Sequence, residues 1–254
     1  MKKKFLIEEM SWKEFETAME DNDIIIIPVG VTEEHGLHNP LGTDTLIAEA
    51  CAKQIGEKSN VPVAAVLPFG YSPSVLSFPG SNSLDPMLYR KVLISYCESY
   101  IKHGAKRFLF INGHGGNTDT VVLVGRDLYD KHGVISFTNQ WWEVLPQLNS
   151  ELDCSDHGGF FETSMMMAVK EETVSMDLAK SAKVNSLTNE IGYNHGWKFR
   201  GASINMPMDL YKVHKYGNVG NEPFKANREL GEKMIELYVD FNVRLIEEMK
   251  EISI

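Results

Sequence analysis

The sequence predicts an α/β protein built around a mainly parallel sheet. Short apolar runs, too continuous for strands exposed on one face, occur at 24–29, 61–67, 107–111 and 134–137. Strands covered on both faces have this composition, which is typical of parallel sheets. Helical patterns fall between the runs, so strand and helix alternate and right-handed crossovers are favoured.

The helices between these strands have recognisable start signals or apolar spacings. Ser11 and Glu14 fit a capping box, and Asp85 followed by Pro86 supplies an N-cap and a first-turn proline. The last long helix carries an apolar stripe at Leu230, Met234, Leu237, Phe241 and Leu245. The expected helices span 11–21, 45–55, 85–104, 118–131 and 223–250, with a further one beginning near Phe160.

Composition excludes several classes of function. The 254 residues contain 25 Lys and Arg against 35 Asp and Glu, a formal net charge of −10 that repels nucleic acid and anionic membranes. No apolar run approaches membrane-spanning length. Cys51, Cys97 and Cys154 are widely spaced and suit a reducing cytoplasm rather than a disulfide framework. With no repeat or linker, residues 1–254 are expected to form a single domain.

Two stretches break the alternation of strands and helices. They are Pro68–Leu84, rich in Pro, Ser and Gly, and Thr188–Glu222, rich in Gly, Asn, His and aromatic residues. Long irregular segments in a compact domain tend to be functional. We expect them to determine specificity for a small-molecule substrate, with these candidate contacts: His195, Trp197, Arg200 and His214.

Metal-ligand side chains gather where two strands end. Glu33, Glu34, His35 and His38 follow the isoleucine strand, Asp44 lies just beyond them, and His114 follows the strand at 107–111. Ligands in open parallel sheets bind beyond these strand ends. Imidazole and carboxylate together suit Zn²⁺, Mn²⁺ or Fe²⁺, and a carboxylate such as Asp44 can bridge two ions. A site for two divalent metals is therefore plausible, although each residue alone is commonly a solvated loop residue.

A third polar segment begins at Asp156. His157 is followed by Gly158 and Gly159, whose backbone freedom lets the imidazole be aimed, and proton transfer is its natural chemistry. Glu162 lies in the first turn of the next helix. It is either a further metal ligand, a catalytic base, or an acidic residue that stabilises the helix dipole.

The glycine-rich loop at 113–117 admits a different function. Backbone N–H groups at a helix N-terminus bind anions, so the loop could cradle a nucleotide or phosphate. It lacks both GxGxxG and GxxxxGK[ST]. A nucleotide- or phosphate-binding module that uses this loop is the alternative to an enzyme.

The motifs, taken in order, resemble the creatininase (creatinine amidohydrolase) family. They are Pro-x-Gly-x-x-Glu-x-His-Gly-x-His followed by Thr-Asp, then Asn-Gly-His-Gly-Gly-Asn, then His-Gly-Gly with Glu-Thr-Ser, all within 28–164. The resemblance implies a three-layer α/β/α fold, hydrolysis of non-peptide C–N bonds and a homohexamer. It also implies metal ligands at Glu33, His35, Asp44 and His114, Asp44 being the bridge, a catalytic histidine at His157, and a role for Glu162.

Departures from the family pattern imply an altered pocket. Creatininase itself has a ligand Glu at the position of Gly116, whereas members with Gly there include formamide deformylases and a mycofactocin maturation peptidase. This chain has Glu34 where family members usually have Gln, Leu37 where they usually have Pro, and Val75 where many have His. These differences argue against creatinine as the substrate.

We therefore expect a metal-dependent amidohydrolase with two divalent ions per subunit. A metal-activated water would attack a cyclic amide, lactam or formamide, and His157 would protonate the leaving nitrogen. Trp141 and Trp142 are either walls of the pocket or core aromatics. Within the family, a formamidopyrimidine-type deformylase or a peptide-maturation hydrolase is the alternative. A further alternative is a degenerate family member that acts only as a scaffold subunit. Such a protein would lack some of the metal ligands, whereas Glu33, His35, Asp44 and His114 are all present here.

Overall fold

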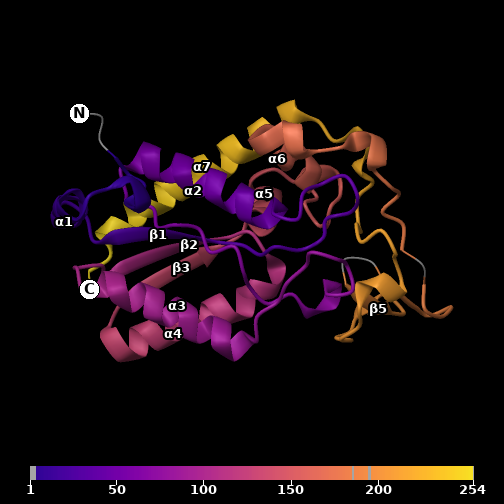
Figure 1. The fold of residues 1–254 in the computed structure, drawn as a ribbon, viewed down its shortest axis with the longest axis horizontal. Helices are drawn as coiled ribbons and strands as arrows, with labels where there is room; N and C mark the ends of the chain where they lie inside the picture. Colours follow the sequence, from indigo (N-terminus) through magenta and orange to yellow (C-terminus); the bar gives the residue numbers. More distant parts are fainter. Residues whose placement is uncertain (1–3, 185, 194–195, 254) are drawn as a thin grey trace.

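A parallel sheet organises the chain, which the computed structural model describes at residues 4–184, 186–193 and 196–253. Its strands are β1 (Ile24–Val29), β2 (Arg107–Asn112) and β3 (Ile135–Asn139), hydrogen-bonded in that order. Figure 1 shows the sheet between two layers of helices. The expected α/β class, with three layers and a mainly parallel sheet, is confirmed.

The four consecutive isoleucines of β1 explain the two helical layers. Ile24 and Ile26 face one side of the sheet and pack in a core with α2 (Thr43–Ser59) and α7 (Arg228–Glu251). Ile25 and Ile27 face the other side, against α3 (Pro86–Ile101) and α4 (Thr118–His132). All four are fully buried, and each stabilises the fold by roughly 1.5–3 kcal/mol relative to an exposed side chain.

The shorter helices complete the two layers. The capping box of α1 (Trp12–Glu20) is present: Ser11 Oγ accepts from the Glu14 N–H and the Glu14 carboxylate accepts from the Ser11 N–H. The helices α5 (Trp141–Leu148) and α6 (Phe160–Lys170) both pack against α7. The helix start expected near Phe160 is therefore confirmed.

The strand expected at 61–67 does not form as a continuous strand. Val63 pairs with Ile26 and Leu67 pairs with Val29, both parallel, but each is an isolated bridge. Between these two bridges the segment advances by four residues, whereas β1 advances by three. The segment therefore contains one extra residue, which interrupts the hydrogen-bonded ladder as in a β-bulge. The segment therefore lies beside β1 without extending the sheet regularly.

The last helix begins later, and is rotated, relative to the prediction. Pro223–Lys225 forms a separate 3₁₀ turn, and Asn227 caps α7 by accepting from the Leu230 N–H at 3.0 Å. Of the expected stripe only Met234 is fully buried, while Leu237 is exposed. The buried face instead includes Ile235, Tyr238, Val239 and Ile246, because α7 faces both α2 and α6. No helix in the described ranges is both long and apolar enough to span a bilayer.

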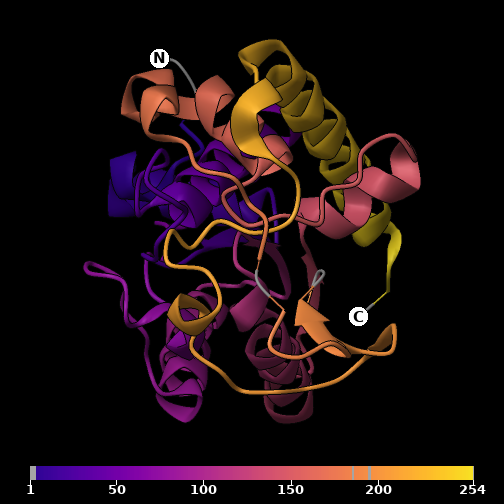
Figure 2. The same ribbon diagram turned by 90° about the vertical axis from the view of Figure 1, so that its right-hand side faces the viewer.

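The segment 188–222 contains a small antiparallel sheet, which the sequence pattern did not reveal. Its strands are β4 (Ile191–Tyr193), β5 (Trp197–Phe199) and β6 (Ala202–Ser203). Figure 1 shows this part at the end of the molecule toward which the parallel strands run, and Figure 2 views it from that side. The segment thus covers the edge of the sheet where the polar motifs emerge.

Candidate metal centre

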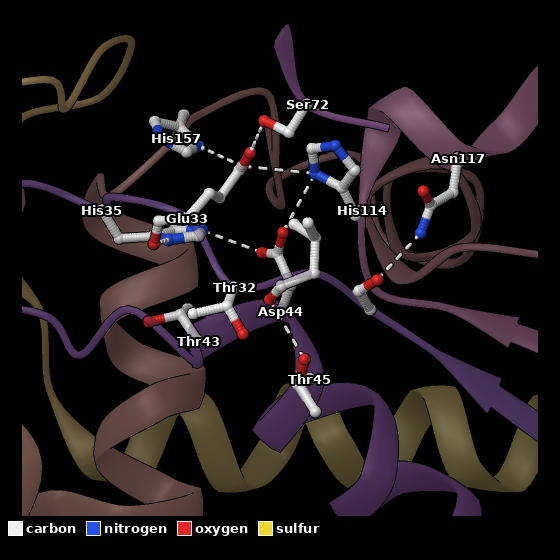
Figure 3. A network of polar contacts seen from close by, with 12 residues as sticks. Thr32, Glu33, His35, Thr43, Asp44, Thr45, Ser72, His114, Asn117 and His157 are labelled. Atoms are coloured by element: carbon white, nitrogen blue, oxygen red, sulfur yellow. Dashed lines mark hydrogen bonds and ion pairs between the residues drawn. The ribbon is translucent and has the colours of Figure 1, made fainter. Parts of the chain in front are cut away.

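Five polar residues from four parts of the chain converge at the carboxyl end of the sheet, and Figure 3 shows four of them: Glu33, His35, Asp44 and His114. Glu33 and His35 lie in the loop after β1, and His114 follows β2. Asp44 and Glu162 lie in the first turns of α2 and α6. Four of the five are at least 95% buried and His114 is largely buried, so they form an enclosed cluster rather than a solvated loop.

Asp44 occupies the centre of this cluster. The helix α2 begins at Thr43, two residues earlier than expected, so Asp44 lies in its first turn, where the helix dipole favours a carboxylate. Asp44 Oδ1 lies 2.8 Å from His35 Nε2, and Oδ2 lies 3.0 Å from His114 Nδ1. Oδ2 is buried and accepts no hydrogen bond of good geometry from the described residues. Its two oxygens thus face two different histidines.

Two ligand sets share Asp44. In one, His114 Nδ1 lies 3.2 Å from Glu33 Oε1. In the other, His35 Nε2 lies 3.5 Å from Glu162 Oε2. In each set one ligand atom per residue lies within 4.8 Å of the others, and a third such group joins Glu33, His35 and His157. The arrangement fits two cations with Asp44 between them.

The outer nitrogens of the two histidines are engaged by backbone carbonyls. His35 Nδ1 lies 3.1 Å from the Glu33 carbonyl oxygen, and His114 Nε2 lies 3.1 Å from that of Tyr71. Histidines that bind metals commonly donate their second N–H in this way, which fixes the nitrogen that faces the ion. His35 Nε2 and His114 Nδ1 are therefore oriented as ligand atoms.

The charges in the cluster are strongly coupled. Burial opposes ionisation of Asp44, but His35 and His114 outweigh it and hold the pKa of Asp44 well below its usual value. The pKa of Glu33 is lowered in the same way, mainly by His114 against the cost of burial. Burial also opposes protonation of His114, yet Glu33 and Asp44 raise its pKa well above the ordinary value. The carboxylates are thus ionised and stabilised by adjacent positive charge.

The donor set fits divalent metal ions. Carboxylate oxygens and imidazole nitrogens are ligands of Zn²⁺, Mn²⁺ and Fe²⁺, and the available oxygen of Asp44 supplies a bridging atom. Gly116 has no side chain that could act as a ligand, and a Cβ there would collide with the carbonyl oxygen of Tyr71. Glu162 occupies the second ligand set instead.

His157 lies at the edge of the cluster with its ring beside that of His35, the ring centroids 4.3 Å apart. Its backbone pairs with Val219, donating its N–H at 2.9 Å and accepting at 2.7 Å. Burial and His35 lower the pKa of His157, while Glu34 and Glu33 raise it more, so that it stands at about 9. The ring lines the cavity and can exchange a proton there.

Asp156 fixes the helix that carries Glu162. Its carboxylate accepts from the N–H groups of Phe161 at 2.9 Å and Glu162 at 3.3 Å, although the N-cap position belongs to Gly159. Burial, with Glu162 nearby, raises the pKa of Asp156 to about 7. Glu162 Oε2 accepts from the Gly158 N–H at 2.6 Å. Sequence reasoning did not assign Asp156 this structural role.

Two further supporting residues were also missed. Ser72 Oγ donates to the Glu33 carboxylate, and Figure 3 shows this contact beside the centre. Asn117 is fully buried, donates to the Gly30 carbonyl oxygen at 3.0 Å and accepts from the Tyr71 N–H at 3.0 Å. The composition of 68–84 suggested a functional segment, but only the fold shows which of its residues reach the centre.

A cavity of about 410 Å³ opens onto the cluster. Trp141 and Trp142 line it, as the first of the two interpretations of these residues expected, and Trp141 is almost wholly buried. From the segment 188–222 the lining residues include Tyr193 and Leu210. The acidic and basic side chains of the described lining are carboxylates and the histidines His114 and His157.

Most of the expected specificity contacts lie elsewhere. Trp197 packs in a small apolar core, Arg200 pairs with Glu190 at 2.6 Å, and His214 Nε2 lies 3.0 Å from the Ser181 carbonyl oxygen. None of these three lines the cavity, and His195 lies outside the described residues. His38 is buried with Nε2 3.1 Å from Thr163 Oγ1, behind the cluster rather than within it.

The loop at 113–117 is not arranged as a phosphate cradle. The Gly113 N–H donates to Val29 at 2.8 Å and the His114 N–H to Asn112 Oδ1 at 3.1 Å. The Asn117 N–H donates back to the His114 carbonyl oxygen at 3.1 Å. These three amides already have partners in the loop or in the neighbouring strands, and a binding module that uses them is disfavoured.

Sequence comparison relates the chain to known hydrolases. A family described as creatininase, creatinine amidohydrolase, matches residues 8–246. A creatinine amidohydrolase of Pseudomonas putida is 31% identical over 70% of this chain and 76% of its own length. A mycofactocin precursor peptide peptidase of Mycolicibacterium smegmatis is 31% identical over 61% of each chain. A 3-dehydro-scyllo-inosose hydrolase of Thermotoga maritima is 26% identical over 65% of this chain and 52% of its own length.

Comparison with solved structures extends over nearly the whole chain. A creatininase described with Mn is 26% identical, with a TM-score of 0.79, and the match covers 97% of this chain and 99% of that one. A mutant creatininase of a Zn–Zn type is also 26% identical at a TM-score of 0.79, covering 97% and 98%. The likeness therefore includes the segments outside the sequence motifs.

Proposed function

This chain belongs to the creatininase family and is a hydrolase, and from that premise we propose that it is a metal-dependent amidohydrolase acting on a small molecule. The bond cleaved is a non-peptide C–N bond of a cyclic amide, lactam or formamide. The observation that carries the proposal is Asp44, whose two oxygens face two separate ligand sets, 2.8 Å from His35 and 3.0 Å from His114.

The proposed cofactor is a pair of divalent ions. Glu33, Asp44 and His114 would hold one, and His35, Asp44 and Glu162 the other. Solved relatives are described with Mn and with Zn, which supports these metals, with Fe as a further candidate. When bound, such ions polarise a carbonyl and lower the pKa of water enough to supply a nucleophile at neutral pH.

The residues of the chain have separate roles in the proposed reaction. Glu33 and Asp44 are ionised acceptors held by adjacent histidines, and Ser72 keeps the Glu33 carboxylate in place. His157 holds the proton that the leaving nitrogen needs when the C–N bond breaks. Glu162 is proposed as a ligand rather than the base, because it lies 3.5 Å from His35 within a ligand set.

The substrate is proposed to be compact. The cavity of about 410 Å³ is walled by Trp141, Trp142 and Tyr193, which leaves room only for a small molecule. Since a Cβ at Gly116 would collide with Tyr71, no acidic ligand can occupy that position as it does in creatininase. This difference disfavours creatinine, and a formamidopyrimidine-type deformylase or a peptide-maturation hydrolase is the alternative within the family.

Two properties of the whole protein belong to the same proposal. We propose a homo-oligomer, a hexamer by family resemblance, in which a neighbouring subunit can complete the pocket. The reducing cytoplasm is the proposed location, because Cys51, Cys97 and Cys154 are free and buried. No partner other than a small-molecule substrate is proposed.

A substrate screen with defined metal content tests the function. Protein loaded with Zn²⁺ or Mn²⁺ is offered formamides, lactams and cyclic amides including creatinine, and the released amine or acid is measured. We expect turnover of at least one class, with loss on chelation and in His114→Ala. The matched control is His132→Ala, since His132 lies on the surface beside Glu98. Activity that survives chelation, or metal-loaded protein that hydrolyses none of these classes, would contradict the proposal.

A further inference from the structure

Glu34 lies between two proposed ligands in the sequence but belongs to neither ligand set. Its neighbours Glu33 and His35 contribute to the cluster, whereas its own carboxylate is buried and is in none of the candidate ligand groups of the described residues. Glu34 Oε1 lies 3.0 Å from His157 Nε2, and Oε2 accepts from the Gly36 N–H at 2.9 Å. The metal sites therefore do not account for this buried carboxylate.

The two ring nitrogens of His157 face different surroundings. Nε2 faces Glu34, while Nδ1 lies 3.7 Å from Glu33 Oε1 on the side of the cluster and the cavity. The backbone of His157 is held independently by its pairing with Val219. The ring thus spans from a carboxylate outside the centre to a carboxylate inside it.

Gly217 makes room for this contact. It has φ +88° and is buried, and a Cβ there would collide with the Glu34 carboxylate. Val219, two residues later, pairs with the His157 backbone. The segment 217–219 therefore accommodates Glu34 and positions His157 at the same time, although the three parts are far apart in sequence.

We propose that Glu34 is a positioning residue that keeps a proton on Nε2 of His157, so that Nδ1 is the nitrogen that exchanges a proton with substrate. The inference rests on the proposed amide hydrolysis. As the C–N bond breaks, its electron pair passes to the leaving nitrogen, and that nitrogen takes the proton from Nδ1. The imidazole that remains is neutral and still donates Nε2–H to Glu34, and the attacking water supplies the next proton.

When one ring nitrogen of a histidine donates a hydrogen bond to a fixed acceptor, that bond determines both the tautomer and the orientation of the ring. A glutamine could accept the same hydrogen bond through its carbonyl oxygen but would bring no charge. A leucine of similar size could do neither. The two substitutions therefore separate hydrogen bonding from the filling of space.

The first measurement needs no turnover. Protein labelled with ¹⁵N-histidine and loaded with Zn²⁺ is examined by long-range ¹H–¹⁵N correlation, and His157 is assigned from the spectrum of His157→Gln. We expect the neutral ring to carry its proton on Nε2 in wild type and Glu34→Gln, and on Nδ1 or on both nitrogens in exchange in Glu34→Leu. The control Glu49→Leu changes a partly exposed glutamate of α2 that pairs with Lys53. An unchanged tautomer in Glu34→Leu overturns the inference.

The second measurement compares two substrates with one acyl group, an alkylamide and a p-nitroanilide. Because p-nitroaniline departs without much help from an acid, Glu34→Leu should lower kcat about 100-fold for the alkylamide but only about threefold for the anilide, with KM unchanged. Glu34→Gln should restore most of the loss. Equal losses for both substrates would show a merely structural role and overturn the inference. If wild type hydrolyses neither substrate, the substrate screen decides the proposed function, and the tautomer measurement decides the role of Glu34.

Discussion

At the scale of single residues, the centre depends on the two nitrogens of each histidine having different partners. His35 and His114 each face Asp44 with one nitrogen and a backbone carbonyl with the other. The carbonyls leave each imidazole one orientation, so little reorganisation is needed when a cation binds. His157 differs, because its second nitrogen faces the Glu34 carboxylate rather than a carbonyl.

Replacing His157 separates proton transfer from metal binding. In His157→Gln we expect the rate of hydrolysis to fall about 10²–10⁴-fold with metal content unchanged, because a general acid contributes about that much. The measurements are steady-state kinetics and metal analysis, with His132→Gln as the surface control. Loss of metal together with activity would place His157 among the ligands, as its grouping with Glu33 and His35 permits.

The three cysteines should be inert in the folded protein. Burial raises the pKa of Cys51 to about 12 and also raises the pKa values of Cys97 and Cys154, so the reactive thiolate is scarce at pH 8. An aromatic disulfide reagent at pH 8 should modify none of them quickly in the native protein and all three in guanidinium. Rapid modification of one thiol in the native protein would contradict the buried positions.

The clustering of the proposed ligand residues was predictable from the sequence because they lie in short motifs directly after strands. Glu33, His35 and His114 follow β1 and β2, and parallel strands bring such ends together. Ser72 and Asp156 were not predictable, since their contacts depend on how loops far apart in sequence fold over the sheet edge. Arg200 and His214 were expected at the pocket but make contacts elsewhere.

At the scale of elements, α6 and α7 approach closely at one glycine. Gly231 of α7 lies against the backbone of Ser164, where a Cβ would collide with the carbonyl oxygen. The helix α6 also carries Glu162, so the packing of the two helices sets the position of a proposed ligand. The C-terminal helix therefore influences where Glu162 lies without contributing a side chain to the centre.

Gly231→Ala tests this close approach. Helix propensity alone would stabilise the protein by about 1 kcal/mol, but overpacking against α6 costs about 1–3 kcal/mol. We expect a lower midpoint in urea unfolding and a weaker metal affinity. Glu236→Ala, on the exposed face of α7, should change the free energy of unfolding by less than about 0.5 kcal/mol. A stabilised Gly231→Ala protein would show that helix packing does not depend on this contact.

Elements with strong local signals were predicted closely, and those set by tertiary packing were not. The capping box of α1, the proline start of α3 and the buried isoleucines of β1 all correspond to the structure. The segment 61–67 contains an extra residue relative to β1, which no local pattern reveals. The buried face of α7 depends on contacts with both α2 and α6. Periodicity alone therefore identified Leu230, Met234 and Leu245, which pack in the core, but also included the exposed Leu237.

At the scale of the whole molecule, one sheet supports both cores and presents the centre at one edge. The apolar clusters on its two faces share the strands β1 and β2, which favours a single domain over 1–254. The segment 188–222 covers that edge (Figure 2). It also contributes Tyr193, Leu210 and Val219 to the cavity lining. The formal charge of −10 includes the clustered carboxylates Glu33, Asp44 and Glu162, which bound cations would neutralise in part.

The stoichiometry of bound metal tests the central claim most directly. Protein stripped with a chelator, reloaded with Zn²⁺ or Mn²⁺ and desalted is measured by mass spectrometry of its metal content. We expect two ions per wild-type chain and fewer than one in Asp44→Ala, because Asp44 is shared by both ligand sets. Asp119→Ala removes an exposed carboxylate from the first turn of α4 and should retain two. A wild-type chain that holds no ion, or an Asp44→Ala chain that holds as many as wild type, would contradict the account.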